Sequence, residues 1–174
     1  LTLLYSFDVA SPRLAASGSG QFGLTDAGEI EMTVRLSDTS LDPYARVLMP
    51  TLSPYTTAIG GGSVRVWGAV YTPDALHIAA TIDDLRLRLF DYELRNRGDL
   101  KVGLDGQILH LDAFGMTGDR TAIDLSGRID LGNDVVTIRA NGEANLAIVQ
   151  GVLPQVRGSG RAEISATIGG TTTT

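Results

Sequence analysis

The chain has 174 residues, of which 43% are hydrophobic and 20% charged, a composition typical of a folded domain that buries a core. Its net charge is −6, and this acidic balance argues against nucleic-acid binding, which usually leaves a basic footprint. The absence of cysteine excludes disulfides, thiolate metal sites and cysteine nucleophiles.

We do not expect the opening segment, 1–9, to be a signal peptide, because it has no basic region and carries Asp8. No apolar run approaches the roughly 18 residues needed to span a bilayer. The chain starts at Leu1 rather than at methionine and ends in a run of threonines. We therefore expect both ends to be cuts through a longer chain.

Regular alternation of apolar and polar residues begins in Glu29–Leu36. A period of two predicts a strand with one apolar and one wet face. The next segment breaks this pattern, because apolar residues in 41–49 recur at helical spacing between Ser40, a plausible N-cap, and Pro50, a stop signal. We expect a short helix of about two turns near 41–49.

Further alternating runs follow at roughly ten-residue spacing through the middle of the chain. They cover 64–71, 76–82, 85–89, 100–104, 109–113, 123–131 and 136–140. Gly60–Gly62 and Asp83-Asp84, which flank such runs, are interpreted as turns. Since no long helices separate the runs, the pattern predicts an all-β antiparallel meander rather than a βαβ fold.

A second helical pattern lies near 146–153, with Asn145 as cap and Pro154 as stop, and the strand Ala162–Ile168 closes the chain. The two helical segments expose an internal repeat of strand, polar turn, short helix, proline, glycine cluster and strand. The offset between the copies is about 105 residues. Residues 1–174 are therefore predicted to be a single segment of a longer repeat array.

The alternating runs share one apolar face of leucine, isoleucine, valine, alanine and glycine, with no obvious polar anchor. A closed sandwich or barrel would keep this face dry, whereas an open groove would let it hold acyl chains. The residues alone leave both interpretations open. The candidate groove-lining, lipid-binding residues are Ile30, Met32, Val34, Val64, Val66, Leu76, Ile78, Leu85, Leu87, Leu89, Val102, Leu104, Leu109, Leu111, Ile123, Leu125, Ile129, Val136, Ile138, Ile164 and Ile168.

Signals for catalysis are weak. His77 and His110 are better explained as solvated or hydrogen-bonded strand residues than as catalytic groups, and no nucleophile elbow accompanies the many serines and aspartates. Gly60–Gly62 lacks the lysine and hydroxyl residue of a phosphate-binding loop. We expect no enzymatic activity, no cofactor and no metal site.

The order of these motifs resembles that of the C-terminal repeat region of TamB-like proteins, within the AsmA-like group of bacterial envelope proteins. The resemblance is carried by LRNRGDLKVGLDGQILHLDAFGMTGDRTAIDLSGRIDL at Leu94–Leu131 and by ANGEANLAIVQGVLPQVRGSGRAEISATIGGT at Ala140–Thr171. The earlier copies of the helix and of the strand after it add two further matches. Each motif is degenerate, and their order is the distinctive feature.

The resemblance implies a long antiparallel sheet curled into an open U-shaped groove, apolar inside and hydrophilic outside. It implies a periplasmic location, in a protein anchored in the inner membrane of a Gram-negative bacterium. It also implies a role in moving phospholipid to the outer membrane, with acyl chains and neighbouring repeats as partners and no nucleic acid. The alternatives are assembly of outer-membrane proteins or autotransporters with a β-barrel partner, and a purely structural spacer.

The first and last strands of such a sheet would each lack a neighbour in the isolated chain. Unpaired strand edges are templates for pairing with other chains. We expect edges near Leu3–Val9 and Ala162–Ile168, and concentration-dependent self-association.

Overall fold

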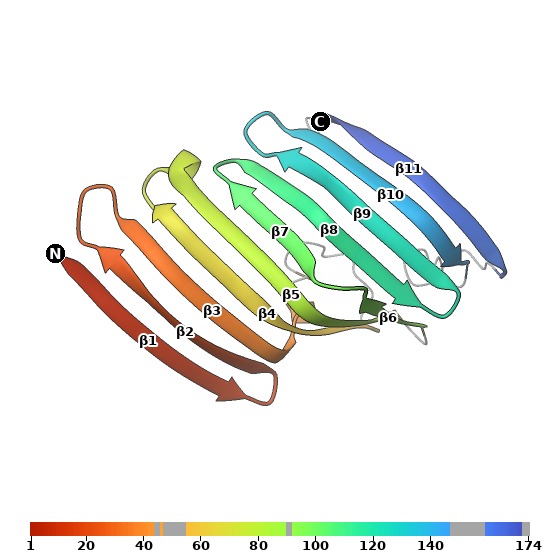
Figure 1. Ribbon diagram of the computed structural model, residues 1–174, viewed down its shortest axis with the longest axis horizontal. Helices are drawn as coiled ribbons and strands as arrows, with labels where there is room; N and C mark the ends of the chain where they lie inside the picture. The colour runs from red at the N-terminus through yellow and green to blue at the C-terminus, as the bar shows by residue number, and fades with distance from the viewer. Residues whose placement is uncertain (44–45, 47–54, 90–91, 147–158, 172–174) are drawn as a thin grey trace.

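All described strands lie in one antiparallel sheet in the computed structural model, which describes residues 1–43, 46, 55–89, 92–146 and 159–171 (Figure 1). Neighbouring strands follow chain order, so the predicted all-β meander is confirmed. The strands are β1 (Thr2–Ser11), β2 (Leu14–Gly23), β3 (Glu29–Ser40), β4 (Thr56–Ala69), β5 (Leu76–Leu89), β6 (Tyr92–Asn96), β7 (Leu100–Asp105), β8 (Ile108–Gly118), β9 (Thr121–Asp130), β10 (Val135–Asn145) and β11 (Arg161–Thr171), with a 3-10 turn η1 (Pro73–Ala75) before β5.

One departure from a simple meander occurs between β5 and β8. The short strands β6 and β7 both pair with β5 on one side and with β8 on the other, so together they occupy one strand position. The link between them contains Gly98 with a φ of 74°, a left-handed conformation that favours glycine. Figure 1 shows β6 and β7 end to end, with the two termini of the chain at opposite ends of the sheet.

Hairpin turns are stabilised by local polar contacts. In the β9–β10 turn the Asp130 carboxylate accepts hydrogen bonds from the backbone N–H groups of Gly132 and Asn133, at 3.1 and 3.0 Å. The Asn133 side chain donates to the same carboxylate at 2.9 Å and is the largest cause of the lowered pKa of Asp130. A carboxylate that caps its own turn in this way stops the strand and starts the return.

A line of bulges crosses the middle of the sheet. The pairing register shifts between Leu36 and Thr39 in β3 and between Leu111 and Phe114 in β8. In β5 it shifts at Asp83, because Gly61 pairs with Asp84 and Gly62 pairs with Ile82. Together with the break between β6 and β7, these irregularities lie next to one another on successive strands. A bulge bends its strand and increases its twist, so the line marks a bend that runs across several strands.

The interpretation of Asp83-Asp84 and Gly60–Gly62 as turns is wrong. Both segments lie inside long strands, β5 and β4, where they form the two sides of a bulge. The apolar positions change phase between Ile82 and Leu85, and a turn and a bulge both produce such a phase change. A turn and a bulge differ in the hydrogen-bonded partners of their residues. The alternation pattern of the sequence does not reveal those partners.

The two predicted helices are not confirmed. The segments near 41–49 and 146–153 fall for the most part on residues 44–45, 47–54 and 147–158, which lie outside the described residues. On either side of them, Leu41 donates its N–H to the carbonyl of Ala58, and Leu146 donates its N–H to the carbonyl of Gly160. The chain thus leaves β3 and β10 through the same kind of contact, while the repeat period itself stays a prediction.

Candidate functional site

Every predicted groove-lining residue lies on the same face of the sheet. Residues that pair directly across antiparallel strands point to the same side, so the register assigns each side chain to a face. One row of partners crosses the whole sheet through Phe7, Gly18, Val34, Val64, Ala80, Val102, Leu111, Gly127, Ile138 and Ile168. We call this side the apolar face and the other side the polar face.

Several members of the apolar face are missing from the predicted set. They are Leu3, Tyr5, Phe7, Val9, Phe22, Leu36, Ile82, Leu94, Leu100, Phe114 and Met116. The alternation of Leu3, Tyr5, Phe7 and Val9 is visible in the sequence and could have been included. Phe114 and Met116 follow the bulge in β8, where the alternation changes phase, so their side could not be assigned without the pairing.

The paired residues of the apolar face include no charged side chain. Its polar members, such as Thr39, Thr56 and Thr121, lie near the strand ends where β3 and β8 finish and β4 and β9 begin. Asn96 is a further polar member, at the bulge line, and its side chain is hydrogen-bonded to backbone groups there. Elsewhere on the face the side chains are aliphatic or aromatic, or are absent at glycines. The arrangement can therefore accommodate hydrocarbon and offers a charged ligand no ionic partner.

Most of the apolar face is half-exposed. Among the predicted residues Leu85 is buried at 8% exposure, Ile168 is 61% exposed, and the others are of intermediate burial. All eleven described strands belong to one sheet, so within the described ranges no second sheet covers this face, and β1 and β11 do not pair to close a barrel. The chain exposes 11032 Å² in total, whereas a compact monomer of 18.4 kDa exposes about 8,200 Å².

A small buried core lies toward one end of the apolar face, on its central strands. Leu85, Leu94, Leu100 and Met116 form a buried cluster near the bulge line, and Leu41, Ile82 and Phe114 are among the side chains that pack against it. Thr39, Thr56 and Thr121 are buried at the same end. The opposite end, around Ile30, Leu104 and Ile129, contains no fully buried apolar side chain in the part of the chain that is described. Burial is thus concentrated toward one end of the face on the central strands, whereas most of the face is half-exposed.

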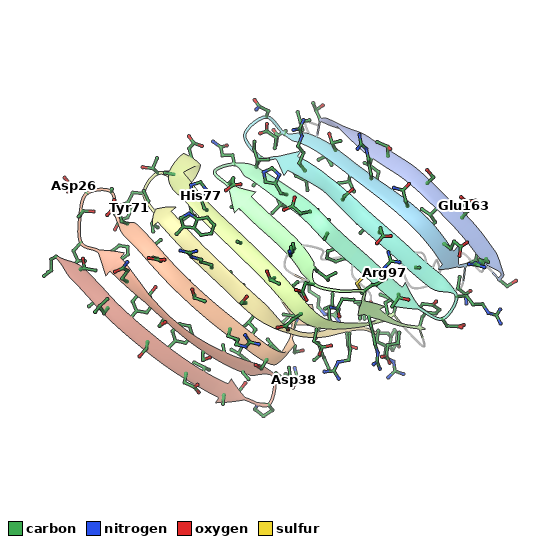
Figure 2. The ribbon with its side chains drawn as sticks, in the orientation of Figure 1. Asp26, Asp38, Tyr71, His77, Arg97 and Glu163 are labelled. Carbon is green, nitrogen blue, oxygen red and sulfur yellow. The ribbon has the colours of Figure 1, made fainter. Side chains whose placement is uncertain are left out.

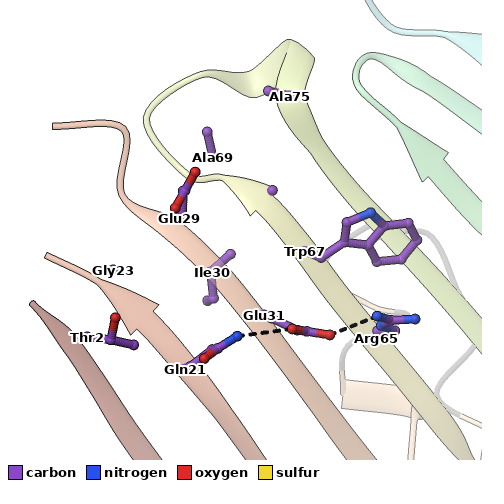
Figure 3. A pocket seen from close by; sticks show the side chains of 11 residues that line it. Thr2, Gln21, Gly23, Glu29, Ile30, Glu31, Arg65, Trp67, Ala69 and Ala75 are labelled. Atoms are coloured by element: carbon purple, nitrogen blue, oxygen red, sulfur yellow. Dashed lines mark hydrogen bonds and ion pairs between the residues drawn. The ribbon is translucent and has the colours of Figure 1, made fainter. Parts of the chain in front are cut away.

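The polar face carries a cross-strand chain of interactions (Figure 3). Gln21 and Arg65 both donate hydrogen bonds to Glu31, at 3.1 and 2.8 Å. The bond from Arg65 is the largest cause of the lowered pKa of Glu31, followed by the bond from Gln21. The Arg65 guanidinium also lies over the Trp67 ring, 5.3 Å from its centroid.

The chain of interactions continues toward β8. Trp67 stacks on His77 with ring centroids 5.3 Å apart, and His77 Nδ1 lies 2.7 Å from an Asp105 carboxylate oxygen. His110 Nε2 lies 3.9 Å from the other oxygen of that carboxylate. Figure 2 shows His77, Arg97 and Glu163 spread along the sheet from β5 to β11. His77 is therefore hydrogen-bonded to the Asp105 carboxylate, and His110 lies near it on the same face.

A shallow hollow of about 570 Å³ opens on the polar face beside Trp67 and is shown in Figure 3. Gln21, Glu29, Glu31 and Arg65 line it together with small residues and backbone. Its central carboxylate, Glu31, already accepts two hydrogen bonds, and Ile30 is the single member of the predicted set in its lining. This hollow is separate from the apolar face and does not gather the predicted residues.

Among the described residues no group of three or more histidine, cysteine, aspartate or glutamate side chains could hold a metal ion. No helix in the described part of the chain is both long enough and apolar enough to cross a membrane. Comparison with known proteins gives no match among family models, curated proteins or solved structures. The apolar face is accordingly the candidate functional site on the strength of its geometry.

Proposed function

We propose that the chain is a segment of a periplasm-spanning bridge whose apolar face shields phospholipid acyl chains as they move from the inner to the outer membrane. The observation that carries the proposal is the broad, charge-free and half-exposed apolar face that crosses every strand of the sheet. The resemblance to TamB-like repeats supports the setting: the periplasm, in a protein anchored in the inner membrane of a Gram-negative bacterium.

The cost of moving a lipid through water explains why such a face is useful. Each methylene exposed to water costs about 0.8 kcal/mol, so an acyl chain of about sixteen carbons costs on the order of 10 kcal/mol. A continuous aliphatic wall removes most of this cost. Because its side chains are similar and uncharged, the wall offers few deep energy minima, so a chain can move along it.

We propose further that the sheet curls around its apolar face into an open U-shaped groove. The bend at the bulge line supports this curvature. Gly142 on the same face has a φ of 145°, and a Cβ there would collide with the Ala122 carbonyl of the neighbouring strand. A glycine at such a position lets two strand backbones approach more closely than any other residue allows.

The decisive experiment places a photo-crosslinking amino acid at Ile138 or at Arg139. These residues are adjacent in β10 and point to opposite faces, because Ile138 pairs with Ile168 on the apolar face and Arg139 pairs with Thr167 on the polar face. After irradiation with phospholipid vesicles, mass spectrometry should detect a lipid adduct at position 138 and not at 139. Equal labelling at both positions, or labelling at neither, would contradict the proposal.

A second candidate function is assembly of outer-membrane proteins through strand pairing with a β-barrel partner. It is favoured by the edges β1 and β11, each of which has one hydrogen-bonded neighbour among the described strands. An exposed edge can add a strand from another protein. This function predicts protein crosslinks at edge residues without lipid adducts at Ile138, and a purely structural spacer predicts neither.

A further inference from the structure

The two edge strands carry few of the features that usually prevent edge-to-edge association. β1 is a regular strand of 10 residues without proline or register shift, and Asp8 is its one charged residue. β11 has 11 residues, and its charges, Arg161 and Glu163, are confined to its start. Lysine, proline, bulges and short length are the usual protections of an edge strand. Both edges are therefore competent to pair with another strand.

The two edges run in the directions that a head-to-tail contact requires. The hydrogen-bonded path has ten positions and is antiparallel at each step, so β11 runs opposite to β1. A second copy displaced along the sheet would place its β1 beside β11 of the first copy in antiparallel orientation. The alternation of strand direction would then continue across the contact.

The backbone hydrogen-bonding pattern of both edges is also compatible with a head-to-tail contact. Leu24 donates its N–H to Leu1 O and Leu146 donates its N–H to Gly160 O, which fixes the residues that bond inward. Because bonding alternates along an antiparallel strand, the outward groups include those of Leu4, Ser6 and Asp8 in β1 and those of Ser165, Thr167 and Gly169 in β11. All of these lie on the polar face, so pairing the two edges keeps both apolar faces on the same side.

Side-chain size indicates the register. The row that crosses the sheet ends at Phe7 on one edge and at Ile168 on the other. Placing these two residues opposite each other brings Tyr5 beside Gly170. Tyr5 already pairs with Gly20 on its other side, where a Cβ on the glycine would lie 2.7 Å from the tyrosine hydroxyl. The aromatic ring would thus be flanked by glycine on both sides, a combination that packs well in sheets.

We propose that copies of this chain join head to tail through β11 and β1, with Ile168 opposite Phe7, and so extend one continuous sheet and one continuous apolar face. The contact is heterologous, because the two surfaces differ, and it leaves a free edge at each end of the assembly. Association therefore continues beyond a dimer as concentration rises. This inference is independent of whether the apolar face binds lipid.

Disulfide crosslinking tests the register directly. The chain contains no cysteine, so introduced thiols are the only ones present. A Ser6→Cys copy mixed with a Gly169→Cys copy should form a covalent pair on oxidation, because directly opposed residues have Cα atoms about 5.5 Å apart, within disulfide range. Position 169 accepts a side chain, since the nearest atom to its Cβ would be Val136 O at 3.8 Å.

The matched control mixes Ser6→Cys with Ser165→Cys copies. These positions are four residues out of register, about 13 Å along the strand, and should not crosslink. Crosslinking of the control pair as efficiently as the in-register pair would overturn the register. Efficient crosslinking of the Ser6→Cys copy to itself would indicate a closed contact between two β1 strands and would overturn the head-to-tail arrangement.

Sedimentation analysis tests the association itself. The average mass should rise beyond that of a dimer between about 10 µM and 1 mM, the range in which weak edge pairing is measurable. Ser6→Pro removes an outward N–H without touching the bonds to β2, as an edge proline does, and should return the chain to a monomer with an unchanged circular dichroism spectrum. Ser6→Ala keeps the N–H and should associate as the parent does. A strict monomer over the whole range, or a mass that stops at the dimer, would overturn the proposal.

Discussion

Leu100 is the apolar side chain most completely shielded from water in the described residues, with 0% exposure. It packs in the buried cluster of Leu85, Leu94 and Met116 on the central strands of the apolar face. Leu100→Ala should lower the free energy of unfolding by about 2–5 kcal/mol, because it removes buried apolar surface and leaves a cavity. Urea unfolding followed by circular dichroism measures this change.

Ile168→Ala is the matched control, since Ile168 lies on the same face but is 61% exposed. Its truncation should cost less than about 1 kcal/mol. Equal costs at the two positions would mean that the apolar face is covered over its whole area. The difference between them therefore measures how unevenly the face is buried.

On the polar face, the neighbours of Glu31 change the pKa of its side chain. The hydrogen bond from Arg65, helped by Gln21, stabilises the carboxylate and lowers its pKa below the usual 4.5. The folded protein therefore holds this proton less tightly than the unfolded chain does. The resulting contribution to stability is present above about pH 4.5, where both states are ionised, and is lost as the pH falls through the lowered pKa.

Arg65→Gln should move the pKa of Glu31 back up toward its usual value, because the largest cause of the shift is removed. Carboxyl-carbon NMR titration measures it. Arg139→Gln, a change of the same kind in β10, should leave the titration of Glu31 unaltered. An unchanged pKa in Arg65→Gln would show that the ion pair does not persist in solution.

At the scale of the strand, Asn96 joins the bulge in β5 to the break between β6 and β7. Its side-chain carbonyl accepts the N–H of Leu85 at 2.8 Å, and its amide donates to the carbonyls of Asp83 and Gly98 at 3.0 and 2.8 Å. The side chain thereby satisfies backbone groups that the bulge withdraws from the ladder. Asn96→Ala should lower the free energy of unfolding by about 1–3 kcal/mol, because it leaves these groups without that partner.

The comparison for this prediction is Asn141→Ala. Asn141 lies on the polar face and accepts one long hydrogen bond, 3.4 Å, from Ser165. Its replacement should change stability by no more than about 0.5 kcal/mol. Urea unfolding measures the free energy of unfolding of both variants. Similar losses of stability in the two would indicate that Asn96 is an ordinary surface residue and does not stabilise the bulge.

Strand alternation predicted most of this sheet because it is a local property. Within a regular strand, every second residue must share a face, so residues such as Val64 and Val66 could be placed correctly without knowing their partners. β2 had no such signal, since its alternate positions include Ala16, Gly18 and Gly20, whose small side chains give little contrast with serine. In the sheet, Tyr5 and Phe7 of β1 lie opposite Gly20 and Gly18, so large side chains of one strand face the small positions of the next.

The bulges and the position of the buried cluster on the apolar face could not be predicted in the same way. Both depend on which residues oppose each other, and the pattern in one strand does not contain its register against the next. Leu85 and Leu87 look equivalent in the sequence, yet Leu85 lies in the buried cluster and Leu87 packs at its margin. The shared face was thus predictable, whereas the distribution of burial along it was not.

For the whole molecule, this distribution of burial predicts uneven stability along the sheet. The buried cluster lies on β5, β6, β7 and β8, whereas β1 and β11 contain no buried residue and have one neighbour each among the described strands. Each strand contacts mainly its immediate neighbours, so the sheet behaves like a repeat array in which stability is a sum of nearest-neighbour terms. Such an array opens most readily at its ends.

Amide hydrogen exchange should therefore be slowest in β5–β8, although β5 and β8 contain bulges, and fastest in β1 and β11, which are regular. The exchange rates are measured in dilute solution, where the chain is monomeric, and again at high concentration. If β11 of one copy pairs with β1 of the next, these two strands should gain protection as concentration rises while β5–β8 stay unchanged, and Ser6→Pro should cancel the gain. Uniform protection at low concentration would instead show that the sheet unfolds as one cooperative unit, with its small core stabilising the distant edges as strongly as the centre.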